Sequence, residues 1–84
     1  TAKQRLCAEL LRLSRPRMGK EGQRIVSPPP LQRELADRIS TQREVVTREL
    51  ASLARKGIIE KTRGGLVLLE PDRLHGLIAE AQNK

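Results

Sequence analysis

Apolar residues recur at helical spacing in four stretches of the chain. In the first stretch Leu6, Leu10 and Leu13 follow the i, i+4, i+7 pattern of a helix with one buried face. The predicted helices cover residues 1–14, 31–39, 42–56 and 71–82. The break between the second and third helices is only Ser40–Thr41. Residues 31–56 are therefore predicted to be a helix-turn-helix.

β-prone apolar runs follow this pair of helices. Residues 58–62 and 66–69 are joined by a glycine-containing turn at 63–65, which predicts a hairpin. Residues 24–26 also fit a short strand, whereas 15–23 contain proline and glycine and are expected to be an exposed basic loop. A helix-turn-helix followed by a hairpin over 58–69 predicts a winged helix-turn-helix, mainly α with a small β wing.

Composition narrows the class of protein. A chain of 84 residues is expected to form one small domain over 1–84. The absence of Phe, Trp and Tyr argues against binding of single-stranded nucleic acid, which relies on aromatic stacking. The net charge of +7 favours a polyanionic partner. No apolar run spans a membrane and no signal peptide is evident, so we expect a cytoplasmic protein without a membrane partner.

The excess positive charge flanks the helix-turn-helix. Residues 1–24 carry a net +5 and residues 51–69 a net +3, whereas 25–50 balance at four basic and four acidic groups. Base edges offer both donors and acceptors, so a surface that reads them needs mixed polarity. The flanks need only be positive to meet phosphates.

The start of the predicted helix 42–56 carries the candidate chemistry. Arg43 and Arg48 could each donate two hydrogen bonds to a guanine, and Glu44 could accept one from a cytosine. Gln42 and Thr47 lie nearby, and Thr47 could meet a thymine methyl or a phosphate. An alternative stays open, because Glu44 and Arg48 are spaced i, i+4 and could simply pair on a solvated helix face.

Three further cations are candidate phosphate contacts. They are Arg33 near the start of the second helix and Lys61 and Arg63 on the wing. For each of the three, a solvated surface charge without a ligand is a nearly equal alternative. Catalysis and metal binding are not expected, because no nucleophile set, phosphate-binding loop or ligand cluster stands out around the single Cys7 and His75.

Residues 31–69 resemble the C-terminal winged helix-turn-helix DNA-binding domain of the Crp/Fnr family of bacterial transcription regulators. The sequence similarity extends from Leu31 to Leu50 and continues through Lys56-Gly57-Ile58-Ile59 to the Arg63-Gly64-Gly65 turn. The likeness is looser over 1–30. The resemblance implies sequence-specific binding of double-stranded DNA for transcription regulation.

The family's recognition signature is an Arg-Glu pair followed by Arg after three intervening residues. Arg43, Glu44 and Arg48 match it, so the resemblance implies that these three read the G·C pairs of a TGTGA-like half-site. Three positions depart from the family: Leu31 replaces Ser or Thr, Ser40 replaces Gly, and Glu49 replaces an apolar residue. We expect a lost helix-end contact at Leu31, local strain at Ser40, and Glu49 at the edge of the core.

The resemblance also implies a longer regulator that begins with an effector-binding β-barrel and a dimerising helix. This chain would be the DNA-binding fragment of that regulator, and we expect no cofactor in the fragment. The full-length protein would form a homodimer on a palindromic site and bind a small effector such as a cyclic nucleotide, with RNA polymerase a candidate partner. Two other readings stay open: a winged helix used for protein–protein contact, and a basic domain that binds DNA without sequence preference.

Overall fold

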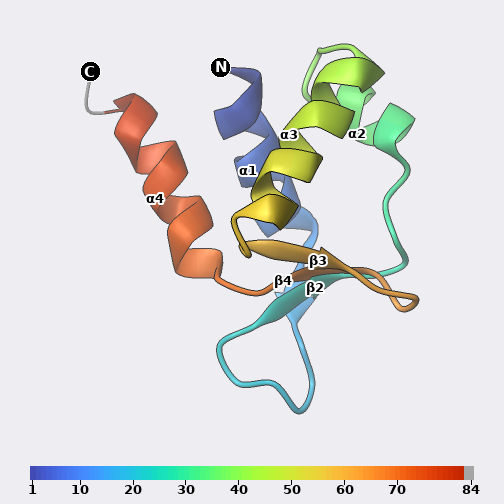
Figure 1. Cartoon of the computed structure of the whole chain (residues 1–84), viewed down its shortest axis with the longest axis vertical. Helices are drawn as coiled ribbons and strands as arrows, with labels where there is room; N and C mark the ends of the chain where they lie inside the picture. Colours follow the sequence, from blue (N-terminus) through green and yellow to red (C-terminus); the bar gives the residue numbers. More distant parts are fainter. Residues whose placement is uncertain (83–84) are drawn as a thin grey trace.

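Four helices lie on one side of a small antiparallel sheet (Figure 1). The structure, a computed structural model, describes the backbone of residues 1–82 and the side chains of 1–80; residues 83 and 84 of the predicted domain lie outside the described part. The helices are α1 (Ala2–Leu13), α2 (Gln32–Arg38), α3 (Arg43–Arg55) and α4 (Pro71–Gln82). The strands are β1 (Arg15–Pro16), β2 (Arg24–Val26), β3 (Ile59–Lys61) and β4 (Leu66–Leu68).

The four predicted helices are confirmed. The first three are one residue shorter at each end than predicted, because the first and last predicted residues are the N-cap and the C-cap of each helix. At the start of α1, Oγ1 of Thr1 accepts a hydrogen bond from the backbone N–H of Gln4. At the start of α2, Leu31 makes no side-chain cap bond, as the sequence predicted, and its side chain is 64% exposed.

The expectation that residues 15–23 form only a loop is wrong. Arg15 and Pro16 form strand β1, which pairs with β2 and extends the sheet to four strands in the order β1-β2-β4-β3. The remainder, residues 17–23, is the turn of that hairpin. A two-residue strand that contains proline shows no alternation in sequence, and proline is tolerated there because β1 is at the edge of the sheet.

The predicted wing is confirmed as the β3–β4 hairpin, which continues the sheet beside β2. Its turn is closed by the backbone N–H and the hydroxyl of Thr62, which donate to the carbonyl O of Gly65 at 2.9 and 2.8 Å. Gly65 has a φ of +156°, and a Cβ at this position would lie 2.3 Å from the carbonyl O of Val26. Only glycine fits so close to β2.

The core lies between the helices and the sheet. Its buried apolar side chains are Leu6, Cys7, Leu10, Val26, Leu35, Ala36, Ile39, Val46, Leu50, Leu53, Ile58, Ile59, Leu66, Val67, Leu68 and Leu74. The set includes the predicted stripe of α3, and Glu49 is half-buried beside it, as expected. Burial of this α3 stripe fixes which side of the helix faces outward.

The turn between α2 and α3 carries the expected strain. Ser40 has a φ of +56°, the left-handed region that glycine adopts most cheaply. The N–H of Thr41 donates to the carbonyl O of Ala36 at 2.9 Å and closes the end of α2. The exposed Ser40 therefore sets the angle between the two helices at a local energetic cost.

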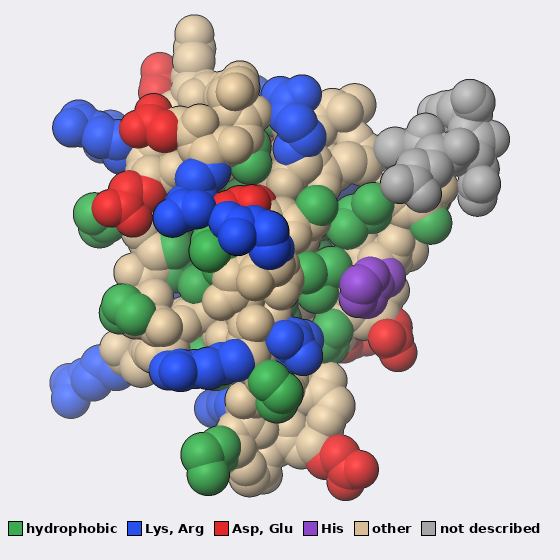
Figure 2. Space-filling model, turned by 180° about the vertical axis from the view of Figure 1, so that it is seen from behind, with side chains coloured by type: hydrophobic (Ala, Val, Ile, Leu, Met, Phe, Trp, Pro, Cys, Tyr) green, Lys and Arg blue, Asp and Glu red, His purple; other side chains and the backbone are tan. Residues whose placement is uncertain are grey.

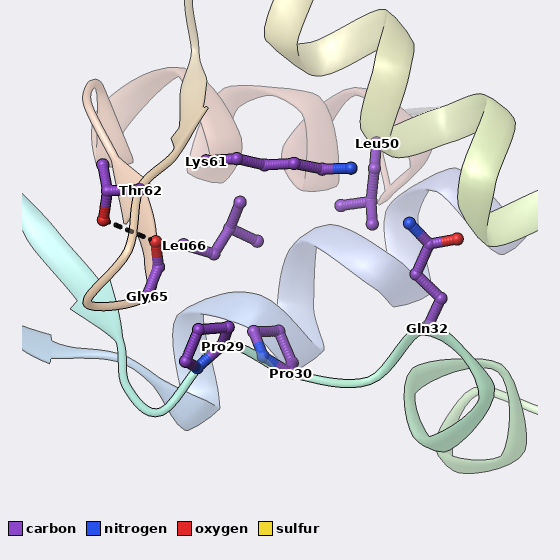
Figure 3. A pocket seen from close by; sticks show the side chains of 8 residues that line it. All are labelled: Pro29, Pro30, Gln32, Leu50, Lys61, Thr62, Gly65 and Leu66. Carbon is purple, nitrogen blue, oxygen red and sulfur yellow. Dashed lines mark hydrogen bonds between the residues drawn. The ribbon is translucent and has the colours of Figure 1, made fainter.

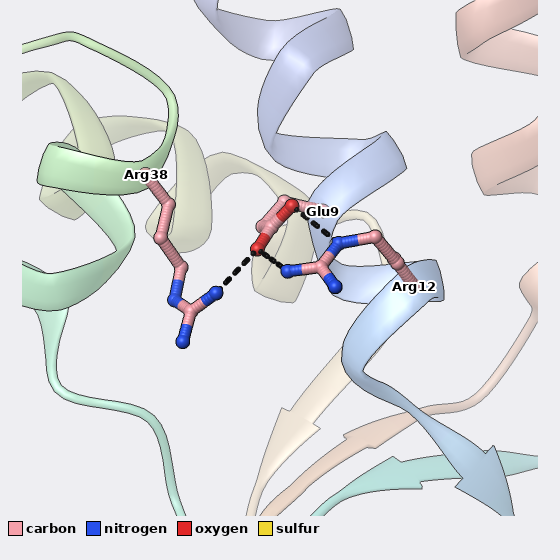
Figure 4. A network of polar contacts seen from close by, with 3 residues as sticks. All are labelled: Glu9, Arg12 and Arg38. Carbon is pink, nitrogen blue, oxygen red and sulfur yellow. Dashed lines mark hydrogen bonds and ion pairs between the residues drawn. The ribbon is translucent and has the colours of Figure 1, made fainter.

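Helix α1 holds this helix-turn-helix through polar contacts (Figure 4). Nε of Arg5 donates to the carbonyl O of Ile39 at 2.9 Å. Both carboxylate oxygens of Glu9 accept from Arg12, at 3.0 and 2.5 Å, and one of them lies 3.3 Å from Arg38 of α2. Hydrogen bonding to Arg12, aided by the charges of Arg12 and Arg38, lowers the pKa of Glu9.

Candidate nucleic-acid interface

The outward face of α3 presents the polar residues that the sequence singled out. Arg43, Glu44, Thr47 and Arg48 are all exposed, because the buried stripe that contains Val46 occupies a different face of the helix. Gln42 is also exposed at the N-cap, and its side chain makes no cap hydrogen bond. The structure therefore places four of these residues on the exposed surface of the first half of α3, with Gln42 directly before the helix.

The base-reading candidates have no partner within the described part of the chain. The side chains of Arg43, Glu44 and Arg48 make no hydrogen bond or ion pair with any residue from 1 to 80. The alternative pairing of Glu44 with Arg48 is thus not formed. Their donors and acceptors are available to a ligand, and they offer the mixed polarity that base edges require.

A hollow between α2 and α3 brings several candidates together. It is lined by Leu31, Gln32, Arg33, Arg43 and Thr47. Arg33 is exposed and has no protein partner in residues 1–80. Three predicted site residues, Arg33 from α2 and Arg43 and Thr47 from α3, thus line the same hollow.

A second hollow separates the helix-turn-helix from the wing (Figure 3). It is lined by Pro29, Pro30, Gln32, Leu50, Lys61, Thr62, Gly65 and Leu66. Lys61 extends from β3 along one side of the hollow, and Gln32 enters it from α2 (Figure 3). Arg63 is exposed in the wing turn but lines neither hollow.

Gln32 lines both hollows, and sequence reasoning did not select it. Its side-chain Oε1 is in hydrogen-bond contact with Oγ1 of Thr47, across the helix-turn-helix. A glutamine in the first turn of a helix fits no motif. The partner lies 15 residues away, so no local spacing could have indicated this contact.

Much of the positive charge near the N-terminus serves the fold. Besides Arg5 and Arg12, Arg17 donates to Oε1 of Gln23 at 2.7 Å and Arg24 to Oγ of Ser14 at 2.7 Å. On the face drawn in Figure 2, basic side chains are interleaved with acidic ones in the upper half. The charge count of residues 1–24 therefore overstated the cations free for phosphates.

The hairpin turn 17–23 also lies away from the wing. Arg24 pairs with Leu68 and Val26 with Leu66, so the wing turn adjoins the Val26 end of β2 and the turn 17–23 adjoins the Arg24 end. Figure 1 shows the two turns leaving opposite ends of the sheet. The exposed cations grouped around α3 are instead those of α2, α3 and the wing.

Residues that could bind a metal ion are not clustered in the described part of the chain. The described residues contain no cluster of three or more His, Cys, Asp or Glu side chains that could hold a metal ion. Burial raises the pKa of the Cys7 thiol to about 11, so this core residue stays protonated at neutral pH. Among the helices described, none has the length and apolar character needed to cross a membrane.

Comparisons with known proteins agree with this geometry. Residues 4–77 match the family model of the Crp-like helix-turn-helix domain. A CRP/FNR-family transcriptional regulator from Thermus thermophilus matches with a TM-score of 0.72 and 30% identity, over 92% of this chain and 40% of that one. Oxidized CprK in complex with o-chlorophenolacetic acid matches with a TM-score of 0.74 and 21% identity, over 93% of this chain and 34% of that one.

The chain thus spans about a third of CprK and two fifths of the Thermus regulator. No curated protein matches its sequence.

Proposed function

The chain belongs to the Crp-like helix-turn-helix domains, a DNA-binding family of transcription regulators rather than of enzymes, and from this we propose that it recognises a specific double-stranded sequence. Helix α3 would lie in the major groove with its N-terminal residues at the base edges. The observation that carries the proposal is the free outward set of Arg43, Glu44 and Arg48.

Each of these three side chains has a role that follows from its chemistry. The guanidinium groups of Arg43 and Arg48 would each donate to O6 and N7 of a guanine, while Glu44 would accept from N4 of a cytosine. The absence of an ion pair between Glu44 and Arg48 supports this division, because no internal contact has to be broken when DNA binds.

The surrounding cations would fix the domain on the phosphate backbone. Arg33 and Lys61 line the two hollows on either side of Gln32, and Arg63 is exposed on the wing. Gln42, whose side chain is not used as a cap, would add a polar contact at the start of α3. Such contacts supply affinity and register but no sequence information.

The relatives are much longer than this chain, so the assembly that binds DNA is also a proposal. Two copies of the domain in a homodimeric regulator would occupy the halves of a palindrome about one helical turn apart. RNA polymerase would be a further partner of that regulator, and a single free domain would bind weakly because it lacks the second half-site contact.

Fluorescence anisotropy tests the proposal with a labelled palindromic TGTGA duplex and a scrambled duplex, each at two salt concentrations. We expect a preference for the palindrome that persists as salt rises, because base contacts are less salt-dependent than phosphate contacts. Equal binding of both duplexes that vanishes with salt would indicate a nonspecific basic domain. Because a single domain is expected to bind weakly, the titration extends to high protein concentration, and no binding of either duplex there would favour a protein–protein module.

A further inference from the structure

The hydroxyl group of Thr47 is already engaged within the protein. Oγ1 lies 3.1 Å from the carbonyl O of Arg43, one turn earlier in α3, and is also in hydrogen-bond contact with Oε1 of Gln32 in α2. A hydroxyl has one hydrogen, so it can donate to only one of these oxygens. Both contacts are satisfied when the Gln32 amide presents its NH2 group to Oγ1 and the hydroxyl donates to Arg43.

This engagement fixes the rotation of the Thr47 side chain. The contact to the carbonyl of Arg43 requires one staggered position of Oγ1 about the Cα–Cβ bond, and this defines where the methyl group Cγ2 lies. Thr47 is exposed, whereas Gln32 is half-buried and less free to move away. The methyl is therefore the group of Thr47 left free for a ligand.

The surroundings of Thr47 suit an apolar contact between two charges. Leu31 lines the same hollow with 64% of its surface exposed, and the basic residues Arg33 and Arg43 also line it. In the major groove, thymine differs from cytosine by a C5 methyl as well as by its hydrogen-bonding edge. A threonine methyl packs against that methyl group.

We propose that Thr47 reads the C5 methyl of a thymine through Cγ2, and that Gln32 is a positioning residue that holds the Thr47 hydroxyl away from the DNA. The inference rests on the proposed function, since it places α3 in the major groove. It assigns Thr47 to base reading rather than to a phosphate, because a phosphate oxygen would take the one hydroxyl hydrogen that goes to the carbonyl O of Arg43.

The test uses the 84-residue chain and the duplex that it selects from a randomised pool. Each thymine of the selected half-site is replaced in turn by deoxyuridine, which lacks only the C5 methyl, and affinity is measured by anisotropy. We expect one position per half-site at which binding weakens about three- to fivefold, the effect of leaving one methyl group unburied. Other thymines should show no such effect.

Four variants then separate the methyl from the hydroxyl. Thr47→Ser should abolish the deoxyuridine effect, whereas Thr47→Val, which keeps a methyl in the same place, should retain it. Gln32→Ala should reduce the effect, because only the contact to the carbonyl O of Arg43 then holds the threonine rotamer. The double variant Gln32→Ala with Thr47→Val should regain the deoxyuridine effect, since valine carries a methyl group in the positions of both Oγ1 and Cγ2 of threonine. A merely structural role of Gln32 would not produce that rescue.

The outcomes distinguish this inference from the proposed function. If the wild-type chain prefers its selected site but no thymine shows a deoxyuridine effect, the methyl contact is wrong while sequence-specific binding stands. A uniform loss on all duplexes in Thr47→Val would likewise overturn it and assign the hydroxyl to a phosphate. If no site is selected from the pool, both proposals fail together.

Discussion

Arg48 is exposed on α3, five residues after Arg43, and its side chain has no protein partner among the described residues. Replacing it with alanine should cost about 1–3 kcal/mol on the preferred site and relax the choice of base at one position, because a bidentate contact to guanine is lost. Anisotropy titrations against the selected duplex and its single-base variants measure both effects.

Arg55→Ala is the matched control for this substitution. Arg55 is exposed and lies in the last turn of the same helix, so its removal deletes the same charge far from the proposed base contacts. We expect a small, sequence-independent loss for Arg55→Ala. If Arg48→Ala behaves in the same way and weakens scrambled DNA as much as the selected site, Arg48 does not read a base.

Lys61 tests the phosphate contacts on the wing. It is exposed on β3 and lines the hollow beside Gln32. Lys61→Ala should weaken binding to all duplexes by a similar factor and reduce the slope of log affinity against log salt by about one unit, because one fewer counterion is released. A change in base preference with an unchanged slope would contradict this role.

At the same scale, the sequence identified which residues α3 exposes but not how they are held. Periodicity alone placed Arg43 and Arg48 on a different face from the buried stripe, roughly a third of a turn away, because the helical repeat is a local property. The contacts of Thr47 with Gln32 and of Arg5 with the carbonyl of Ile39 connect residues that are 15 and 34 positions apart. Only the packing of the helices brings such pairs together.

Among the elements, the turn between α2 and α3 offers a test of stored strain. Ser40 has a φ of +56°, so Ser40→Gly should stabilise the fold by up to about 1 kcal/mol by removing the cost of a side chain in the left-handed region. Urea unfolding followed by circular dichroism measures the change. Thr41→Gly, at the next position and without a positive φ, should instead destabilise the chain.

The strands show where element prediction from sequence fails. The wing was predictable because two apolar runs flank a glycine turn, whereas β1 consists of Arg15 and Pro16 and owes its extended pairing to β2. Short edge strands are defined by their neighbour rather than by their own pattern of residues. For the same reason the four-stranded order of the sheet could not be predicted from the sequence.

For the whole molecule, the cluster of Glu9, Arg12 and Arg38 links α1 to the helix-turn-helix and should make stability depend on pH. The pKa of Glu9 is lower in the fold than its usual value near 4.5. Its contribution is therefore fully present above about pH 4.5 and is lost as the pH falls through the lower folded value. Urea unfolding at several pH values should show this loss.

Glu9→Gln should flatten the acid side of that stability profile, because the glutamine cannot titrate. Glu60→Gln is the control, since Glu60 is exposed on β3 and forms no ion pair within residues 1–80. An acid profile that is unchanged in Glu9→Gln, or equally changed in Glu60→Gln, would show that the helix-linking cluster is not the source of the pH dependence.

The close approach of Gly65 to the carbonyl of Val26 limits how the wing can be redesigned or can diverge. A side chain at position 65 would push the hairpin off β2, so this position is closed to substitution. A Cβ on Gly64, by contrast, would meet no atom within 4 Å. Side chains of other size or charge should therefore be accepted at the exposed positions 63 and 64, and variants that alter the contacts of the wing are best made there, while Gly65 keeps the hairpin against β2.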